Sequence, residues 1–277
     1  MKNAPPIGTR YTLGPEITDE QQAHFEAYGF LHFDRVASPD ELAAAAREVD
    51  AIEAAWVAEG RDKVNGIPLF QGFIEGKPFI QRFTFTSMFS PAIRAFVLDS
   101  RFEPIRKMVG ANARVGHDEK DGVVLNRFVN LPGSIYKELG WHTDGLRDLF
   151  YGRLPQAMFN VGLHFDRVSA ADGGLRLLPG THRQGFWKMA LAKPYFFYHR
   201  PDPAEIVVET EPGDLTVHDG RLWHRVARSN KAGWGSLRRS MYVPYQTGPH
   251  EKKHEGSPTP FYHHLGRLSR WLRSRVG

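Results

Sequence analysis

The chain has 277 residues, with 36 Lys and Arg against 31 Asp and Glu, 13 His and no Cys. Hydrophobic residues make up 41% and aromatic residues 12%, which excludes a disordered chain, and the lack of Cys excludes a disulfide scaffold and any thiolate metal site. No apolar run approaches the roughly 18 residues that span a bilayer, and the N-terminal stretch lacks the apolar core of a signal peptide, so we expect a cytoplasmic location. The net charge of +5 is spread along the chain without a clustered basic and aromatic stripe, which argues against nucleic-acid binding.

The N-terminal part of the chain predicts mainly helices, several of them with recognisable start and stop signals. Residues 61–90 are rich in Gly and Phe and predict irregular or extended structure. The predicted elements are a short helix from the Thr18 capping box to Gly29, a strand over 30–33, an Ala-rich helix from Ser38 to about Gly60, and a helix from Ser90 to near Gly110.

From Val123 the pattern changes to short β-rich segments separated by Pro-Gly and Asp-Gly turns. Helices followed by such segments indicate an α+β fold with a mainly β core, a barrel or a sandwich. We expect one domain over 1–277, with a helical support over 1–110, a β core over 111–247 and a tail over 248–277. The predicted strands span 123–129, 140–144, 157–165, 175–178, 206–209, 215–217, 224–227 and 241–245.

The tail predicts a basic amphipathic helix. Such a helix either packs on the domain or on a partner subunit, or lies on an anionic membrane, and a single apolar stripe is common in docked helices. Peripheral membrane contact is therefore the alternative interpretation, and the oligomeric state is left open. The apolar stripe comprises Phe261, Leu265, Leu268, Leu272 and Val276, and the arginines elsewhere around the helix are Arg267, Arg270, Arg273 and Arg275.

A candidate metal site lies in the segment Gly140–Gly145. Residues two apart on a strand point to the same face, so His142 and Asp144 can meet one ion. The candidate third ligand is His224, about eighty residues further on at the start of another predicted strand. Two imidazoles and one carboxylate on one face of iron(II) leave coordination positions open, which is typical of non-haem oxygenases, whereas a structural zinc site needs four ligands.

Two neighbouring arginines, Arg238 and Arg239, follow His224 on the last predicted strand. The negative charges of Asp144 and a bound 2-oxoglutarate exceed the positive charge of iron(II) by one. One guanidinium restores neutrality and can also pair bidentately with the far carboxylate of 2-oxoglutarate. Because neighbours on a strand point to opposite faces, only one of the two arginines can face the interior.

Four motifs occur in a fixed order: Trp141–Asp144, Asp172–Arg183, Pro212–His224 and the arginine strand. Together with the segment 17–42, they resemble the phytanoyl-CoA dioxygenase-like family of iron(II)/2-oxoglutarate-dependent oxygenases, over roughly residues 17–246. The resemblance implies a double-stranded β-helix, a jelly-roll or cupin-like barrel. It also implies iron(II) held by His142, Asp144 and His224, with O₂ as co-reactant. The 2-oxoglutarate would be held by Arg238, with Arg239 as the alternative.

The implied activity is that of a dioxygenase that hydroxylates an unactivated C–H bond and releases succinate and CO₂. The carboxylate of Asp144 favours hydroxylation over halogenation, because related halogenases lack it. The substrate is expected to be a small, anionic metabolite, lipid or natural-product intermediate, and no motif names it. The alternative is a cupin-like metal-binding protein that is non-catalytic or acts as a redox-neutral isomerase or hydrolase.

The sequence departs from the family pattern near the expected 2-oxoglutarate site. The family often has a Ser two residues after the distal His, where this chain has Val226, and the chain carries an insertion over 230–235. Asn126, on the first predicted core strand, is a candidate to hydrogen-bond the cosubstrate instead. His218 is expected to be a packed or hydrogen-bonded imidazole, and His263 a surface group. Three arginines, Arg82, Arg127 and Arg147, are expected to be surface charges, with contact to an anionic group of the substrate as the alternative.

Overall fold

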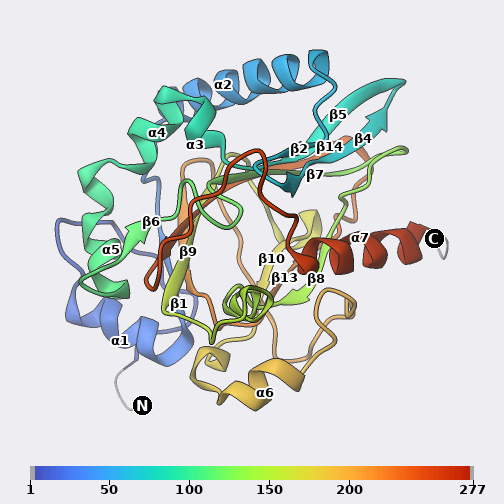
Figure 1. Cartoon of the computed structure of the whole chain (residues 1–277). Helices are drawn as coiled ribbons and strands as arrows, with labels where there is room; N and C mark the ends of the chain where they lie inside the picture. Colours follow the sequence, from blue (N-terminus) through green and yellow to red (C-terminus); the bar gives the residue numbers. More distant parts are fainter. Residues whose placement is uncertain (1–3, 275–277) are drawn as a thin grey trace.

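The computed structural model describes residues 4–274, and its centre is a pair of antiparallel β-sheets (Figure 1). The large sheet has the order β1 (Phe30–Phe33), β12 (Leu215–Asp219), β9 (Met158–His164), β14 (Gly233–Gln246), β7 (Val124–Asn130), β5 (Lys77–Phe83) and β4 (Phe70–Ile74), with β6 (Arg114–Val115) paired to β14. The small sheet has the order β11 (Ile206–Val207), β10 (Gly174–Leu177), β13 (His224–Ala227) and β8 (Leu139–His142). A separate hairpin joins β2 (Lys63–Val64) and β3 (Ile67–Pro68).

This arrangement confirms the expected jelly-roll core. Each predicted core strand corresponds to one of β7 to β14, with ends that differ by a few residues except in β14. That strand has 14 residues and begins at Gly233, so the second half of the expected insertion is the start of β14 and not a loop. Of residues 61–90, expected to be irregular or extended, 63–83 form the two hairpins β2–β3 and β4–β5, whereas 86–89 form a short helix.

The first helices begin and end where their capping residues predict. In α1 (Asp19–Tyr28) the Thr18 side chain caps the backbone of Gln21, and Gly29 ends the helix at a φ of 81°, a left-handed conformation that favours glycine. The longer α2 (Pro39–Ala58) has the Ser38 capping box and a Pro in its first turn.

The helix predicted from Ser90 to Gly110 is wrong in its length. The chain instead forms α4 (Pro91–Val97), η1 (Ser100–Phe102) and α5 (Glu103–Val109), preceded by the single turn α3 (Thr86–Phe89). The Asp99 side chain accepts a hydrogen bond from the Arg101 amide and starts a new helical turn. Pro104 lacks the amide hydrogen that a continuous helix needs, and it lies in the first turn of α5, where that hydrogen has no partner to bond.

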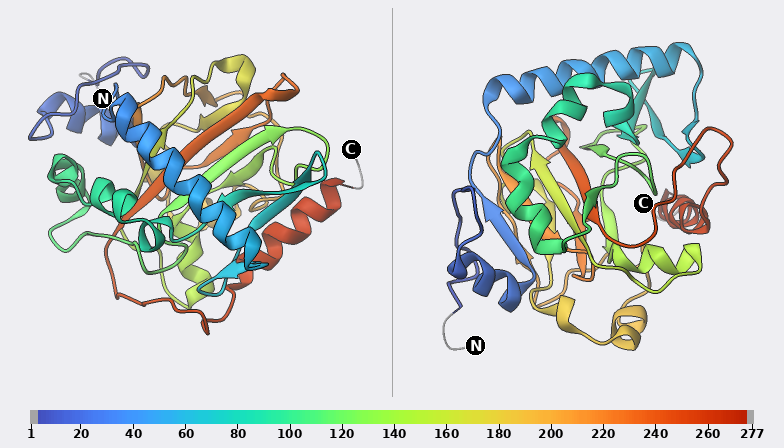
Figure 2. Two further views of the ribbon diagram at one scale, coloured as in Figure 1. Left: turned by 90° about the horizontal axis from the view of Figure 1, so that it is seen from above. Right: turned by 60° about the vertical axis from the view of Figure 1, so that its left-hand side comes forward.

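The main hydrophobic core lies between the large sheet and the helices α1 to α5. Figure 2 shows α2 crossing the outer face of this sheet. Fully buried side chains such as Phe33, Phe83 and Ile105 come from both layers. Because the helices cover only the outer face, the inner face is free to line a cavity between the two sheets.

The chain ends in α7 (Phe261–Ser274), which packs beside the helical turn η2 (Gly145–Tyr151). The docked helix is confirmed, but the face expected to pack is wrong: Phe261 is 61%, Leu268 46% and Leu272 44% exposed. The opposite face of α7 is held by hydrogen bonds from Tyr262, His263 and Ser269. Val276 and Arg275 lie outside the described residues. The remaining short elements are η3 (Ala170–Asp172), η4 (Thr181–Arg183) and α6 (Phe186–Leu191).

Within residues 4–274, no helix combines the length and the hydrophobicity that a membrane crossing requires.

Candidate metal centre

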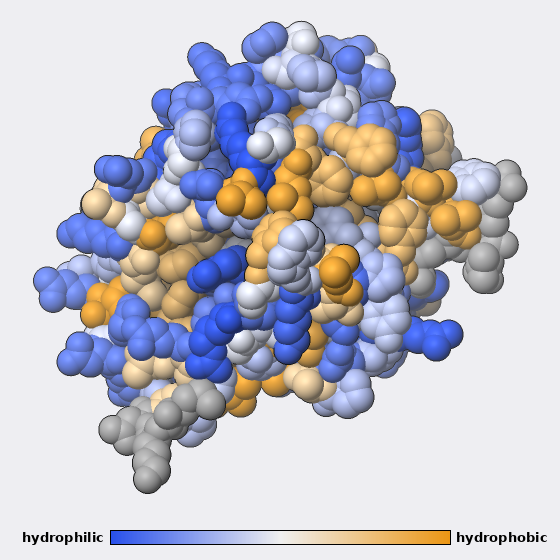
Figure 3. Space-filling model, turned by 60° about the horizontal axis from the view of Figure 1, so that its bottom comes forward, coloured by the Kyte–Doolittle hydropathy of each residue, from blue (hydrophilic) through white to orange (hydrophobic). Residues whose placement is uncertain are grey.

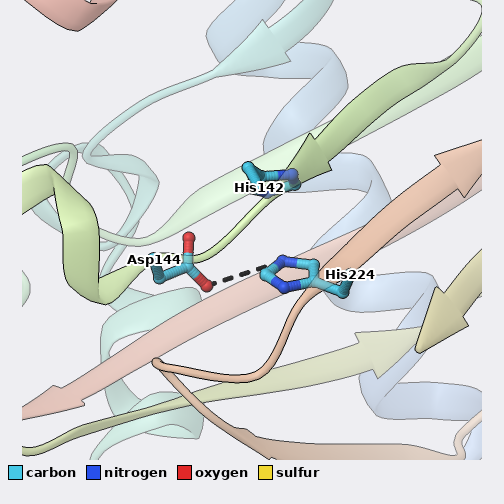
Figure 4. A group of neighbouring side chains, drawn as sticks. All are labelled: His142, Asp144 and His224. Atoms are coloured by element: carbon cyan, nitrogen blue, oxygen red, sulfur yellow. Dashed lines mark ion pairs between the residues drawn. The ribbon is translucent and has the colours of Figure 1, made fainter. Parts of the chain in front are cut away.

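The three predicted metal ligands meet at the edge of the small sheet (Figure 4). His142 ends β8 and His224 begins β13, and the two residues are direct partners in the strand register. Asp144 follows two residues after His142, with an oxygen 3.7 Å from Nε2 of His224. One donor atom from each residue lies within 4.8 Å of the others, and all three side chains are buried. The structure therefore brings together the set that the sequence predicts.

Backbone carbonyls fix which ring nitrogen of each histidine is available. Nδ1 of His142 lies 2.9 Å from the Gly140 carbonyl oxygen, and Nδ1 of His224 lies 3.0 Å from that of Leu222. A carbonyl oxygen only accepts, so Nδ1 of each neutral ring carries the proton and donates it. The Nε2 lone pairs of both rings are therefore free for a metal, the usual arrangement for ligating histidines.

The protonation states of the site also suit a cation. Burial lowers the pKa of His142 to about 4, and burial together with the neighbouring His142 lowers the pKa of His224 well below its usual value. Burial alone would raise the pKa of Asp144, but Arg147 and the nearby imidazoles hold that pKa well below its usual value. Two neutral imidazoles and one carboxylate are therefore the forms present near neutral pH, and this donor set fits iron(II).

Other side chains hold the Asp144 carboxylate in place. Nδ2 of Asn160, on β9, donates a 2.8 Å hydrogen bond to Oδ2, and Nη2 of Arg147 lies 2.7 Å from Oδ1. His218 is fully buried, as expected, and its Nε2 lies 3.5 Å from Oδ2, so this imidazole packs against the ligand carboxylate. The spacing of Arg147, one helical turn after Asp144, was the sequence signal that could have identified it.

The site opens into a chamber of about 1400 Å³ between the sheets. The ligands lie on its wall with Asn126 and Tyr242, and Oδ1 of Asn126 has no hydrogen-bond partner within residues 4–274. The chamber exceeds the roughly 300–1,000 Å³ of most small-molecule sites. It is therefore large enough for a cosubstrate and a sizeable substrate together.

The two candidate arginines lie on opposite sides of β14. Arg238 is 5% exposed and donates hydrogen bonds to the carbonyl oxygens of Ala227 and Lys137, at 2.7 and 3.1 Å. Its guanidinium lies over the ring of Phe128, which lines the chamber, and burial together with Arg176 lowers its pKa to about 10. Arg239 faces outward and pairs with Asp166 at 2.6 Å.

Four residues expected at the surface are buried or largely buried. Arg82 and Arg127 are each 6% exposed because they form ion pairs, Arg82 with Asp121 and Arg127 with two acids of α2. His263 is 7% exposed and bonds to Asp121, and the Arg147 side chain is 20% exposed. The surface assignments of these residues are therefore wrong, because carboxylates from distant segments compensate their charge or polarity. Arg82 and Arg147 line the chamber, where the alternative interpretation places them, whereas Arg127 does not.

Two further groups of His and acidic residues fall within metal-ligand distance, but they offer less to a cation. In the first, Asp214 is already paired with Arg10, His32 and backbone amides. In the second, Glu119 pairs with Arg114, and His250 is exposed. In both groups Nε2 of the histidine already lies against a carboxylate oxygen, at 3.0 Å in His32 and 2.9 Å in His250, whereas Nε2 of His142 and His224 has no hydrogen-bond partner among residues 4–274.

Comparison with known proteins places the chain in a family. The sequence profile of the phytanoyl-CoA dioxygenase (PhyH) family matches residues 25–233. The protein named dioxygenase af480, from Aspergillus fumigatus, is 24% identical over 238 residues, covering 84% of this chain and 67% of that protein. The ectoine dioxygenase of Bordetella parapertussis is 24% identical over 217 residues, covering 74% of this chain and 65% of that enzyme. The chain thus spans about two thirds of the length of each relative.

Solved structures share the fold. HygX from Streptomyces hygroscopicus, crystallised with nickel and 2-oxoglutarate, superposes with a TM-score of 0.60 at 17% identity, covering 86% of this chain and 97% of that one. The α-ketoglutarate-dependent carbocyclase SnoK, from nogalamycin biosynthesis, gives a TM-score of 0.61 at 18% identity, covering 93% of each chain. At these identities the likeness shows the fold alone.

Proposed function

Because the chain belongs to the phytanoyl-CoA dioxygenase family, we propose that it is an iron(II)- and 2-oxoglutarate-dependent oxygenase with His142, Asp144 and His224 as the metal ligands. The observation that carries this proposal is the donor set itself: two free Nε2 lone pairs and an ionised carboxylate converge on the wall of a large chamber. Three ligands on one side leave positions for a cosubstrate and O₂. We propose that residues 1–277 act as one such domain, and the cytoplasmic location stays a prediction.

We propose that Arg238, and not Arg239, binds the far carboxylate of 2-oxoglutarate. Arg238 is desolvated, has no carboxylate within ion-pair distance in residues 4–274, and retains an unpartnered Nε. It bonds to Ala227, three residues along β13 from the ligand His224, which is roughly 10 Å on a strand. Asn126 is proposed as a hydrogen-bonding partner of the same cosubstrate, because its Oδ1 is unpartnered on the chamber wall.

When bound, iron(II) with 2-oxoglutarate supplies O₂ activation and oxidation of a C–H bond, with succinate and CO₂ as coproducts. The chain's own part is to hold the reacting groups and to keep water out. The carbonyls of Gly140 and Leu222 hold both ligand imidazoles in one tautomer, and Arg147 keeps Asp144 ionised. The burial of these side chains leaves the chamber as the route for cosubstrate and substrate.

We propose hydroxylation of an anionic metabolite, lipid or natural-product intermediate as the reaction. The chamber supports an anionic substrate through Lys137 and Arg228, which line it without a carboxylate within ion-pair distance in residues 4–274. Burial and the neighbouring Arg228 lower the pKa of Lys137. An anionic group bound beside Lys137 would therefore favour its charged form and pair with it. The chamber volume supports the larger members of this substrate class.

A turnover screen tests the proposal. The full chain with iron(II) and 2-oxoglutarate is offered a panel of acidic metabolites and lipids, and succinate and O₂ uptake are measured. We expect succinate in step with substrate loss, and a raised KM for the substrate but not for 2-oxoglutarate in Lys137→Gln. Conversion without O₂ or succinate would contradict the proposal and favour the redox-neutral isomerase or hydrolase.

A further inference from the structure

The helix α7 docks by its polar face. Tyr262, His263 and Ser269 are 3%, 7% and 5% exposed, whereas apolar neighbours such as Phe261 and Leu268 face solvent. In Figure 3, which views the molecule from below, hydrophobic side chains appear at the surface among the charged ones. An amphipathic helix normally buries its apolar stripe. Instead, α7 is held by the hydrogen bonds of these buried residues and by contacts of the Tyr262 ring with Phe150 and Tyr151 of η2.

Most of these hydrogen bonds end on one carboxylate, Asp121, which lies in the connection before β7 and is 3% exposed. Oδ1 of Asp121 accepts a 2.5 Å hydrogen bond from the Tyr262 hydroxyl and lies 3.1 Å from Nε2 of His263. Oδ2 accepts from Nη2 of Arg82 at 2.7 Å and lies 3.5 Å from Nη1 of Arg147. A buried charge with this many partners is costly to disturb, because each lost partner leaves the others uncompensated.

Arg147 connects this carboxylate with the metal site. It lies in η2, the turn that begins immediately after Asp144, and its two Nη atoms lie against Asp121 and Asp144. Its guanidinium also lies 5.8 Å from the ring centre of Tyr262. The contacts therefore run without a gap from α7 through Asp121 and Arg147 to Oδ1 of Asp144.

We infer that α7 is coupled to the metal ligand Asp144 through Asp121, with Arg147 as a positioning residue that orients the ligand carboxylate. The inference rests on the proposed role of Asp144 as a metal ligand. Residues of α7, among them Arg267, Trp271 and Leu272, also line the chamber. The same buried contacts therefore hold both the α7 part of the chamber wall and the metal ligand Asp144.

The coupling between α7 and Asp144 can be measured in two ways, as an effect of α7 on metal affinity and as an effect of metal on the docking of α7. If α7 docking orients Asp144, metal binding must in turn stabilise the docked helix by the same factor. Outer contacts of metal ligands are typically worth 10–100-fold in metal affinity. Removing the Tyr262 hydroxyl therefore weakens metal binding, although Tyr262 does not contact a metal ligand. In turn, bound metal protects α7 from cleavage, although the metal does not contact the helix.

Mn(II) alone, added to the metal-free full chain, tests both effects. Mn(II) affinity is measured by titration, and α7 docking by the rate of tryptic cleavage at its arginines, with and without Mn(II). The variants are Tyr262→Phe and Arg147→Met. Their matched controls are Tyr28→Phe, which removes a hydroxyl bonded to the Pro5 carbonyl, and Arg153→Met, which removes an ion pair with Glu251.

We expect both variants to bind Mn(II) about tenfold more weakly and to lose Mn(II) protection of α7, while both controls bind within twofold of the wild type. If Tyr262→Phe speeds cleavage of α7 but binds Mn(II) as the wild type does, the coupling is refuted and the proposed function stands. If the wild type binds no Mn(II), the proposed metal site itself fails. Tyr262→Phe keeps the buried ring, so it decides the question even if Arg147→Met does not fold.

Discussion

The two oxygens of Asp144 are held from two different regions of the molecule. The sheets hold Oδ2, through Asn160 on β9 and with His218 and His224 close by on β12 and β13. The helical side holds Oδ1, through Arg147 in η2 and, beyond it, Asp121 and α7. One ligand therefore has two supports of different construction.

The difference lies in what fixes each support. On the sheet side, strand register places the residues, and the backbone hydrogen bonds of several strands would have to break before they moved. On the helical side, the buried charges of Asp121 and Arg147, together with two side chains of α7, hold the carboxylate in place. We infer that the sheet side gives the site its basic geometry, whereas the helical side is the part that a mutation or a change of pH can adjust.

The largest effect should come from the sheet side. Arg238→Ala removes the proposed partner of the 2-oxoglutarate carboxylate, whereas Arg239→Ala removes an outward ion pair with Asp166. Two charge-assisted hydrogen bonds are worth about 3 kcal/mol or more, so we expect the KM for 2-oxoglutarate to rise roughly 100-fold in Arg238→Ala. Arg239→Ala is the matched control and should stay within about twofold. Equal effects of the two variants on KM would contradict the assignment.

A double-mutant cycle tests whether the two supports are separate. Asn160→Ala removes a hydrogen bond to the Asp144 carboxylate and should weaken metal binding about tenfold. Combined with Tyr262→Phe, its free-energy cost should add, because the two act on different oxygens. The double variant Arg147→Met/Tyr262→Phe should lose little more metal-binding free energy than Arg147→Met alone, because Tyr262 acts on Asp144 through Arg147. Mn(II) titration of the single and double variants measures both; strict additivity in the second pair would show that Arg147 and Tyr262 act independently.

Acid should loosen α7 before the sheets. Buried histidines of the sheets, such as His142, also have lowered pKa values, but they become accessible to protons only when the strands separate, whereas His263 becomes accessible when α7 alone undocks. Burial lowers the pKa of His263 below its usual value of 6.5, so folding favours the neutral ring. The undocked helix takes up a proton below about pH 6.5 and the docked helix does not, so docking loses stability as the pH falls from about 6.5 toward the lowered pKa. One proton contributes at most about 1.4 kcal/mol per pH unit.

Hydrogen exchange in α7 and in β13, at pH 7.5 and pH 6, measures this difference. His263→Gln keeps an N–H donor without titrating in this range and should remove the pH dependence of exchange in α7. His264→Gln changes the exposed neighbour and serves as the control. The idea is wrong if α7 and β13 respond equally to pH in the wild type.

The smallest effect should come from the exposed apolar stripe of α7. We propose that Phe261 and Leu268 make peripheral contact with anionic membranes, because both are exposed and arginines stand beside them in the sequence. Leu268→Ser should change the free energy of unfolding by less than about 0.5 kcal/mol and leave turnover unchanged. It should reduce co-sedimentation with vesicles of anionic lipid, relative to the wild type and to the control Leu98→Ser, which is also exposed. If the wild type does not bind such vesicles, the membrane contact is refuted.

Local patterns predicted the sheet side well. Alternation and turn residues located the core strands. The sequence also paired His142 with Asp144 correctly, but for the wrong reason: β8 ends at His142, and Asp144 has the helical backbone angles of the residue that precedes η2. The same rules failed on the helical side. Asp121 and Tyr262 are 141 residues apart, and no periodicity signals such a contact. For the same reason an apolar stripe predicted the wrong docked face of α7, since hydrogen bonds to a distant carboxylate outweighed it.

The proposed ligands His142, Asp144 and His224 would hold iron(II) in a site that also takes 2-oxoglutarate. The most direct measurement is the visible spectrum of the metal-free chain after anaerobic addition of iron(II) and 2-oxoglutarate. We expect a weak charge-transfer band in the wild type and in Asp62→Ala, which alters another chamber carboxylate, and no band in Asp144→Ala. A wild type without the band, or an Asp144→Ala variant that keeps it, would show that these three residues do not form the iron site.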